Sequence, residues 1–465
     1  MVVQHNLTAM NSNRMLGITT GQQAKSSEKL ASGFQINRAA DDAAGLSISE
    51  KMRKQMRGLD RASTNAQDGV SAVQTAEGAL TEVHSMLQRI NELAVQAANG
   101  TNSVDDRNAI QAEVEQLTTE INRVADATKF NEAYLLKGGV DVKTVNINAH
   151  DAGLKGTLVQ GSGDTSTFTI ELKAGETVSI AGVDYRLYDD SNELTEVEAD
   201  ITAFAADANN GKSVIIDGTT YTYKTDADGN GTKAFVDASN KLYTAADLNA
   251  IIEDGTTVKL DTGNILQVVD SSKDDARSIT AAQALVKAAL IEASSIGGSK
   301  STAVIENDPT DNNDGTFTYT IKKATVDVQE DLTFSLHVGA DADMTNKIGV
   351  SIAVMDAAGL GIQGLNVADE TGIAATYAID AIADAVAKVS AQRSALGAIQ
   401  NRLEHTIANL DNVVENTTAA ESRIRDTDMA SEMVEYSKNN ILAQAGQSML
   451  AQANQATQGV LSLLG

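Results

Sequence analysis

The last segment of the chain, Asn439 to Gly465, reads NNILAQAGQSMLAQANQATQGVLSLLG and carries no charged side chain. Its apolar residues recur every three or four positions, a spacing that places them on one face of a helix. That stripe consists of Ile441, Ala445, Met449, Ala453, Ala456, Val460 and Leu464. The other faces are rich in Asn and Gln, whose amides would be costly to bury in hydrocarbon, so the stripe favours a protein partner over a membrane. Periodicity alone leaves open whether that partner is the chain's own domain or another molecule.

The opposite end of the chain predicts a weaker helix. Residues 1–34 are polar, with a sparse set of apolar positions that would form only a marginal helix in isolation. Those positions are Val3, Leu7, Met10, Leu16, Ile18 and Leu30. Gly33 then predicts a break, and Asp41 and Asp42 are well placed to cap a new helix and to fill its first turn.

Two long seams of apolar residues follow the helical period and are typical of coiled coils. The first begins near Ala43, ends at Asn99-Gly100 and is followed by a second helix from Ser103, so that the two form a helical hairpin. The second seam begins near Ile373 and reaches a polar break over Thr417–Asp428, after which the terminal helix begins. The residues expected to form the core seam are Leu80, Val83, Leu87, Ile90, Leu396, Ile399, Leu403 and Leu410.

The middle of the chain has a different character. Short alternating runs separated by Gly, Asp and Asn predict strands. These runs are Thr167–Leu172, Thr177–Leu187, Ser213–Lys224, Thr316–Ile321 and Leu332–Val338. Helical patterns interrupt them near residues 194–204, 244–252 and 279–293.

The predicted fold class is therefore α+β and multidomain. Both chain ends form a coiled-coil-like helical bundle, and a β-rich acidic middle is inserted between them. The expected segments are residues 1–34 and 421–465 as two terminal helices, 35–140 and 372–420 as the helical core, and 141–371 as one or more outer domains.

Charge and composition narrow the function classes. The chain has 465 residues and a net charge of −27, of which −21 falls on residues 141–370. An acidic field of this size argues against nucleic acid or an anionic membrane as partner. The absence of Cys excludes disulfides and a cysteine nucleophile, and the N-terminus does not read as a secretory signal peptide.

No catalytic residues, metal site or cofactor are predicted. The five histidines are scattered, and the sequence has no His-Glu-x-x-His, GxxxxGK[ST] or GxSxG motif. Asp226 to Asp237 partly matches a calcium loop, but position 8 is Lys233 and the flanks YTYKT and KAFVD alternate like strands. A hairpin turn is the favoured interpretation of this stretch.

Several short motifs stand out at the two ends of the chain. On the N-terminal side these are KLASGFQINRAADDAAG (29–45), NAQDG (65–69), QRINELAVQ (88–96) and TKFN (128–131). On the C-terminal side they are SRIRD (422–426), QAG (444–446), LAQANQ (450–455) and VLSLL (460–464). Together they resemble the motifs of bacterial flagellin, and the resemblance covers roughly residues 1–140 and 372–465 and leaves out the middle.

The resemblance implies a non-enzymatic structural subunit that polymerises into the helical filament of the bacterial flagellum and serves motility. It implies that the terminal helices line an inner tube, with polymerisation through Val3, Leu7, Met10, Ile441, Ala445, Met449, Ala453, Val460 and Leu464. It also implies export through the flagellum's own channel, without a cleaved signal peptide, to an extracellular location.

Several partners follow from the same resemblance. They are further copies of the chain, filament cap and hook-junction proteins, and an export chaperone wrapped around the C-terminal helix from about Met429. A Toll-like immune receptor is a further implied partner, with contacts at Arg89, Leu93 and Glu113. The patch departs from that of stimulatory members at Ile90-Asn91.

Three alternatives remain at this stage. A hook–filament junction protein has similar terminal helices, although the patch at 88–96 and the ending at 460–464 favour the filament subunit. An adhesin would use the acidic middle, and an enzyme embedded in the middle would need a protease motif that the sequence lacks.

Overall fold

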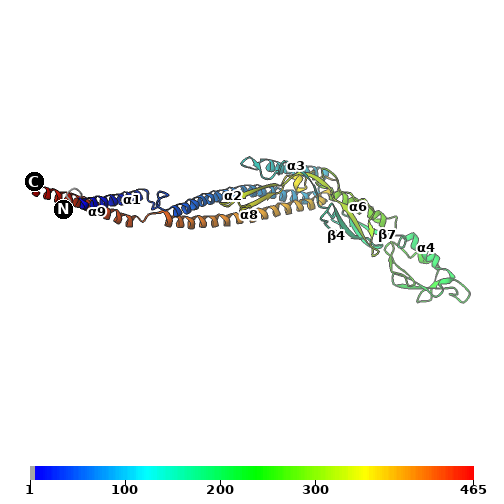
Figure 1. The fold of residues 1–465 in the computed structure, drawn as a ribbon. Coiled ribbons are helices and arrows are strands. Elements are labelled where there is room, and N and C mark those ends of the chain that lie inside the picture. Colours follow the sequence, from blue (N-terminus) through cyan, green and yellow to red (C-terminus); the bar gives the residue numbers. More distant parts are fainter. Residues whose placement is uncertain (1–5, 465) are drawn as a thin grey trace. The chain divides into compact units, whose positions relative to one another are not determined.

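The computed structural model describes residues 6–464 and divides the chain into two compact units. Unit 1 is drawn from Met1–Val73, Phe334–Val350 and Gly397–Gly465, and unit 2 from Gln74–Thr333 and Ser351–Leu396. Both ends of the chain thus belong to the same unit, and the strands fall between them in sequence (Figure 1). The predicted class, α+β with helical ends and a β-rich middle, is confirmed.

Long helices occupy both ends of the chain, and strands with short helices occupy the middle. The helices are α1 (Leu7–Ser32), α2 (Ala43–Ala97), α3 (Val104–Ala127), α4 (Leu194–Phe204), η1 (Asp207–Asn209), α5 (Ala245–Asn249), α6 (Ile279–Ser294), η2 (Met344–Asn346), α7 (Ala357–Leu360), α8 (Ile373–Arg425) and α9 (Met429–Leu464). The strands are β1 (Lys129–Phe130), β2 (Ala133–Tyr134), β3 (Val142–Asn146), β4 (Gly156–Val159), β5 (Thr165–Glu171), β6 (Thr177–Ile180), β7 (Val183–Tyr188), β8 (Ser213–Ile216), β9 (Thr219–Lys224), β10 (Ala234–Val236), β11 (Leu242–Tyr243), β12 (Thr257–Leu260), β13 (Leu266–Gln267), β14 (Ala276–Ser278), β15 (Thr310–Asp311), β16 (Thr316–Lys322), β17 (Thr325–Gln329), β18 (Leu332–His337) and β19 (Lys347–Ile352).

Local side-chain chemistry explains where the long helices begin. The Asn6 side chain accepts a hydrogen bond from Ala9 N at 2.9 Å and caps α1, which ends at Gly33 with φ 75°. The Asp42 carboxylate accepts from the backbone N–H groups of Ala44 and Gly45 and so caps α2. Helix α3 begins with a capping box between Ser103 and Asp106.

In unit 1, residues 43–73 of α2 pack against residues 397–425 of α8. One cluster of this interface contains Leu59, Ala62 and Leu410. A second contains Ala66 and Leu403 together with Val338 and Ile348 from the segment that includes β18 and β19. Gly69 packs closely there, and a Cβ on it would force the Leu336 side chain to move.

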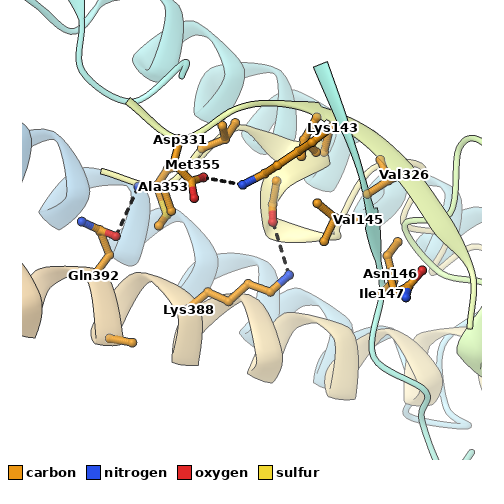
Figure 2. A pocket seen from close by; sticks show the side chains of 15 residues that line it. Lys143, Val145, Asn146, Ile147, Val326, Asp331, Ala353, Met355, Lys388 and Gln392 are labelled. Atoms are coloured by element: carbon orange, nitrogen blue, oxygen red, sulfur yellow. Dashed lines mark hydrogen bonds and ion pairs between the residues drawn. The ribbon is translucent and has the colours of Figure 1, made fainter. Parts of the chain in front are cut away.

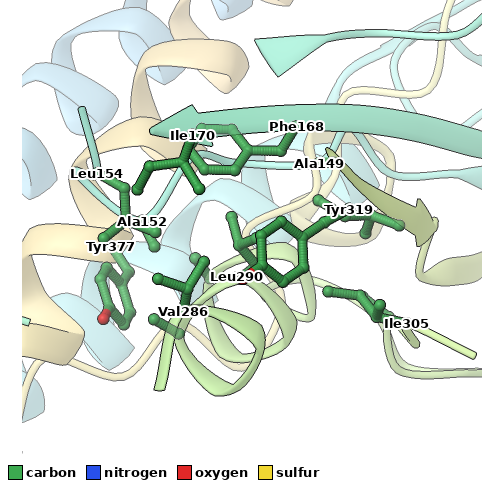
Figure 3. Close-up of a cluster of buried hydrophobic side chains, with 14 of the residues drawn as sticks. Ala149, Ala152, Leu154, Phe168, Ile170, Val286, Leu290, Ile305, Tyr319 and Tyr377 are labelled. Carbon is green, nitrogen blue, oxygen red and sulfur yellow. The ribbon is translucent and has the colours of Figure 1, made fainter. Parts of the chain in front are cut away.

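Two hydrophobic cores of unit 2 lie among its strands. In the first, β5 and β16 pair so that Phe168 lies opposite Tyr319, and α6 covers them with Val286 and Leu290, as Figure 3 shows. Tyr377 of α8 also belongs to this core. The second core lies between α4, α5 and a six-stranded sheet of order β11-β10-β9-β8-β12-β13.

Smaller sheets complete the strand pairing. A four-stranded sheet has the order β15-β16-β5-β4, and a three-stranded sheet has the order β14-β7-β6. The two-stranded pairs are β1-β2, β17-β3 and β18-β19.

Two predicted strands are in fact hairpins. Thr177–Leu187 divides into β6 and β7 around Ala181 and Gly182, whose φ angles are 52° and 75°. Ser213–Lys224 divides in the same way around Asp217 and Gly218. Two consecutive residues of positive φ make a turn that matches the twist of the flanking strands, so the alternating pattern continues through it.

The loop from Asp226 is a hairpin connection, as favoured from the sequence. Strands β9 and β10 pair antiparallel on either side of it. The Asp226 carboxylate accepts from Gly231 N, and the Asp228 carboxylate accepts from Asn230 N and the Thr232 hydroxyl. These carboxylates therefore close the loop's own turns.

The predicted break over Thr417–Asp428 was too long. Helix α8 continues to Arg425, and α9 begins at Met429. The hydroxyl of Thr418 donates to Val414 O within the helix, and the buried Glu421 is paired with Arg53 of α2 at 2.9 Å. These tertiary and local contacts keep the polar segment helical.

Asp356 provides a prediction about pH. Its carboxylate accepts from Gly359 N and caps α7, and burial raises its pKa because the charged form is desolvated. The folded state then holds the proton more tightly than the unfolded state, so the ionised group lowers stability at neutral pH, and this effect vanishes below the unfolded pKa. We expect Asp356→Asn to be more stable than the parent at about pH 7 and equally stable at about pH 3.

Urea unfolding followed by circular dichroism at both pH values would measure this difference. Asp247 is the control, because hydrogen bonds from the Thr244 backbone N–H and hydroxyl lower its pKa. Asp247→Asn should therefore be less stable than the parent at neutral pH. A stability of Asp356→Asn below that of the parent at neutral pH would contradict the assignment.

Candidate functional site

The two terminal helices, α1 and α9, lie side by side (Figure 1). The Asn6 side-chain amide donates to Ala453 O at 3.0 Å, and the Lys29 ammonium group lies 3.6 Å from the Glu432 carboxylate near the other end. The side chains buried along this pair are small or polar, namely Ser26, Asn439 and Ala443. The contact between α1 and α9 therefore buries few of their large apolar side chains.

Most large apolar residues of these helices instead face solvent. Leu7 is 74% exposed and Ile441 is 66% exposed. The further exposed residues on the two helices are Met10, Met15, Ile18, Met429, Met433, Val434, Leu442 and Met449. Since exposed apolar surface often marks an interaction site, these side chains are candidates for an interface with other molecules.

The sequence-predicted stripe is placed mainly on this exposed side. Ala445 is exposed like Ile441 and Met449, whereas Ala453 is partly buried. Val3 lies outside the described residues, as do the side chains of Val460 and Leu464. A shallow hollow on α9 is lined by Ile441, the first residue of the stripe, and by residues on either side of it, including Met433, Val434 and Leu442. The sequence pattern missed Met433 and Val434 because they precede the uncharged stretch and lie among charged neighbours.

The connections between the terminal helices and the rest of unit 1 are paired with each other. Gln35 N donates to Arg425 O at 2.7 Å, and Thr427 N donates to Gly33 O at 2.9 Å. Phe34 lies within this pairing, and its half-buried ring is contacted by the guanidinium groups of Arg53 and Arg425, 5.4 Å and 4.8 Å from the ring centroid. We call this group, residues 33–35 and 425–427 with Arg53, the linker clamp.

Removal of the Phe34 ring should lower the local stability of the linker clamp. Each cation–π contact contributes about 0.5–2 kcal/mol, so Phe34→Ala should open the clamp about tenfold more often and speed trypsin cleavage of the adjoining linker after Arg38. Limited proteolysis of the soluble subunit, with mass spectrometry of the cleaved peptides, would measure the rate. Phe34→Tyr keeps the aromatic face and should be cut at the parent rate. Equal cleavage of Phe34→Ala and the parent would show that the ring does not hold the linker.

The predicted core-seam residues lie inside their units. In unit 2, Leu80, Val83, Leu87, Ile90 and Leu396 have no exposed surface. In unit 1, Leu403 and Leu410 are buried and Ile399 is partly buried against the Ala66 cluster.

The predicted receptor-contact residues differ in accessibility. Arg89 of α2 donates to Glu113 of α3 at 2.9 Å and to Glu92 at 3.2 Å, and these hydrogen bonds raise its pKa, with Glu113 the larger cause. The Arg89 and Glu113 side chains are both substantially exposed. Leu93 is buried and packs inward, so a surface contact through Leu93 does not fit this structure.

The described residues hold neither a metal-binding cluster nor a membrane span. Across residues 6–464, no group of three or more His, Asp or Glu side chains is arranged to hold a metal ion. Within the same range, no helix combines the length and the apolar character needed to cross a bilayer.

Comparison with known proteins agrees with the motifs at the two ends. The bacterial flagellin N-terminal helical region matches residues 3–141, and the bacterial flagellin C-terminal helical region matches residues 379–464. A flagellin of Clostridium tyrobutyricum is 40% identical over 461 residues, which cover 98% of this chain and 100% of that protein. A flagellin of Bacillus subtilis is 34% identical, and a flagellar filament core protein of Treponema maltophilum is 31% identical; each alignment covers both chains completely.

Solved structures give weaker likenesses. FliC of Burkholderia pseudomallei aligns with a TM-score of 0.27 and 20% identity, covering 72% of this chain and 99% of that one. A flagellar hook-associated protein of Legionella pneumophila aligns with a TM-score of 0.34 and 12% identity, covering 81% and 98%. These scores are too low to carry an argument, whereas the sequence matches extend over the full chain. Flagellins are structural proteins and not enzymes, and by these matches the chain belongs to the bacterial flagellin family.

Proposed function

We propose that this chain builds the filament of the bacterial flagellum, an extracellular motility organelle, through the exposed apolar faces of α1 and α9. The chain is a filament subunit by family, and its full-length relatives are flagellins. The single observation that supports the role of the terminal helices is their pairing through small residues, which leaves Leu7, Ile441 and their neighbours in solvent. Burial of one such side chain by a neighbouring subunit would contribute about 1.5–3 kcal/mol.

The mechanism follows from this arrangement. A pair of helices that buries little of its own apolar surface gains order when further copies cover it. If one face of each copy binds a different face of the next copy, the contact repeats without closing into a ring. The result is an open helical polymer. In this proposal residues 1–34 and 429–465 form the inner tube, residues 35–140 and 372–425 the surrounding core, and residues 141–371 the outer domains.

Electron microscopy of purified subunits added to short filament seeds would test the proposal. Full-length protein should extend the seeds into long filaments. A variant lacking residues 1–34 and 430–465 should stay monomeric and keep most of the helical circular dichroism signal of α2, α3 and α8. Filament growth by the truncated protein would refute the role of the terminal helices.

Two alternatives are less well supported. A hook–filament junction protein is disfavoured because the curated relatives that match the full chain at 31–40% identity are flagellins and a filament core protein. A surface adhesin would act through the acidic middle, and deletion of residues 141–370 should then abolish binding to the host surface while filaments still form.

Export and its chaperone form a finer part of the proposal. The subunit would leave the cell unfolded through the flagellum's own channel, with a chaperone covering α9 from Met429 onward. The apolar residues along α9, including Met433, Ile441 and Met449, offer the surface that a helix-binding chaperone would shield from water. Cap and hook-junction proteins would contact the same helices at the two ends of the filament.

Recognition by a Toll-like immune receptor would use Arg89 and Glu113. Both side chains are accessible and form one ion-paired patch across α2 and α3. Buried Leu93 would support this patch from below. Subunit packing is the alternative role of the same two residues, since an exposed ion pair suits either contact equally.

A further inference from the structure

A cavity of about 430 Å³ lies in unit 2 beside α8 (Figure 2). Its walls are mostly apolar. Val145 and Ile147 come from β3 and the residue after it, Val326 from β17, and Val354 and Met355 from the segment before α7. Pockets of about 300–1,000 Å³ with such walls and few polar groups are typical of small-molecule sites.

The polar groups of this cavity are unequal. Lys143 is paired with Asp331 at 2.9 Å, so its charge is matched. Gln392 is also satisfied, since it accepts from Ala353 N and donates to Ser351 O. These groups hold the two sides of the cavity together. The remaining charged side chain of the lining is Lys388.

Lys388 reaches from α8 to the end of α7. Its Nζ donates to Gly359 O and Leu360 O, both at 3.2 Å, and Figure 2 shows one of these hydrogen bonds. An ammonium group has three N–H donors, and within the described part of the chain these carbonyls account for two. Surrounding protein lowers the pKa of Lys388 by desolvation, which Asp384 on the same helix only partly opposes. The Lys388 side chain is exposed overall, so its ammonium group is accessible to a ligand that enters the cavity.

We propose that this cavity binds a small aliphatic carboxylate, with the hydrocarbon chain against the apolar wall and the carboxylate on the Lys388 ammonium group. The apolar lining favours a hydrocarbon chain, and the positive charge of Lys388 selects a negative head group over a positive one. The site uses residues of unit 2 alone and is independent of the terminal helices that we assign to polymerisation.

Three probes of equal length would test the charge preference. Titration calorimetry of the full-length monomer with octanoate should give a dissociation constant below about 1 mM. Octan-1-ol should bind at least about tenfold more weakly, because its hydrocarbon chain contacts the apolar wall but its head group carries no negative charge. Octylammonium should give no detectable heat. Octanoate affinity should also fall as the pH rises through the lowered pKa of Lys388, because the neutral amine no longer attracts the anion.

Matched variants separate the charge from the cavity. Lys388→Met should weaken octanoate binding at least about tenfold and leave octan-1-ol unaffected, whereas Lys388→Arg should retain most of the affinity. Ala391 lines the cavity on α8 and Ala387 does not, although both are exposed. Ala391→Leu should therefore abolish octanoate binding without touching Lys388, and Ala387→Leu should bind like the parent.

Several outcomes would overturn the proposal. They are equal affinity for octanoate and octylammonium, octanoate binding that survives Ala391→Leu in a folded protein, and octanoate binding indifferent to Lys388→Met. Absence of octanoate binding to the parent, with the cavity residues protected from hydrogen exchange only in filaments, would assign the cavity to a neighbouring copy instead.

Discussion

Replacement of Ile441 by aspartate should stop filament growth while the subunit stays folded. Ile441 lies on the exposed side of α9, whereas Ala443, two residues further on, is buried on the side of α1. A carboxylate at position 441 therefore costs little in the monomer. If a neighbouring subunit covers this position, each new contact must bury an unpaired charge at a cost of several kcal/mol. Seeded elongation, followed by light scattering and electron microscopy, should fall by at least about a hundredfold.

The controls for this variant use conservative and remote changes. Ile441→Leu keeps the apolar surface and should elongate at close to the parent rate. Val434→Asp, at another exposed apolar position of α9, should block growth in the same way. Ile265→Asp makes the same change at an exposed isoleucine of the outer domains and should leave elongation unchanged. Growth of the Ile441→Asp subunit at the parent rate would show that this face of α9 stays in solvent within the filament.

Arg107→Met should be the most damaging single change in unit 2. Arg107 is 3% exposed although it belongs to the first turn of α3. Its guanidinium group donates to four main-chain carbonyls, those of Ala97 at 2.9 Å, Asn99 at 3.4 Å, Asp369 at 3.5 Å and Glu370 at 2.9 Å. Methionine fills the space but donates nothing, so several carbonyls lose their partner. We expect a loss of about 3–5 kcal/mol in the free energy of unfolding.

Urea unfolding monitored by circular dichroism would measure this loss. Arg123 provides the matched control, since it lies on the same helix but is exposed and paired with Glu120 at the surface. Arg123→Met should change stability by less than about 0.5 kcal/mol. Arg107→Lys should fall between the two, because a single ammonium group cannot reach all the carbonyls that the planar guanidinium group spans. A stability of Arg107→Met equal to that of Arg123→Met would contradict the assigned role.

The termini of the long helices could be predicted from the sequence because capping residues act on backbone groups close to them in the chain. Asp42 and Ser103 bind backbone N–H groups within three residues of themselves, and Gly33 supplies a left-handed φ angle. Such chemistry does not depend on the rest of the fold. The hairpins at Gly182 and Gly218 were also local, but their alternation continued through the turn and concealed it.

The proposed polymerisation surface was only partly predictable from the sequence. Periodicity placed Ile441, Ala445 and Met449 on one face, but a stripe does not reveal whether the chain itself covers it. That answer depends on Ser26, Asn439 and Ala443, which have no apolar periodicity and nevertheless form the buried contact between α1 and α9. Arg107 was unpredictable for a similar reason, since its acceptors lie on main-chain segments as distant in sequence as Glu370.

The hydrogen bond between Asn6 and Ala453 joins residues 447 positions apart in the chain. The linker clamp and the packing of α2 on α8 in unit 1 likewise join one end of the chain to the other. Closing so large a loop carries an entropic cost, and folds dominated by distant contacts form slowly. Because synthesis begins at the N-terminus, unit 1 cannot be completed until its last segment has been made. The order of the chain itself therefore delays the folding of unit 1.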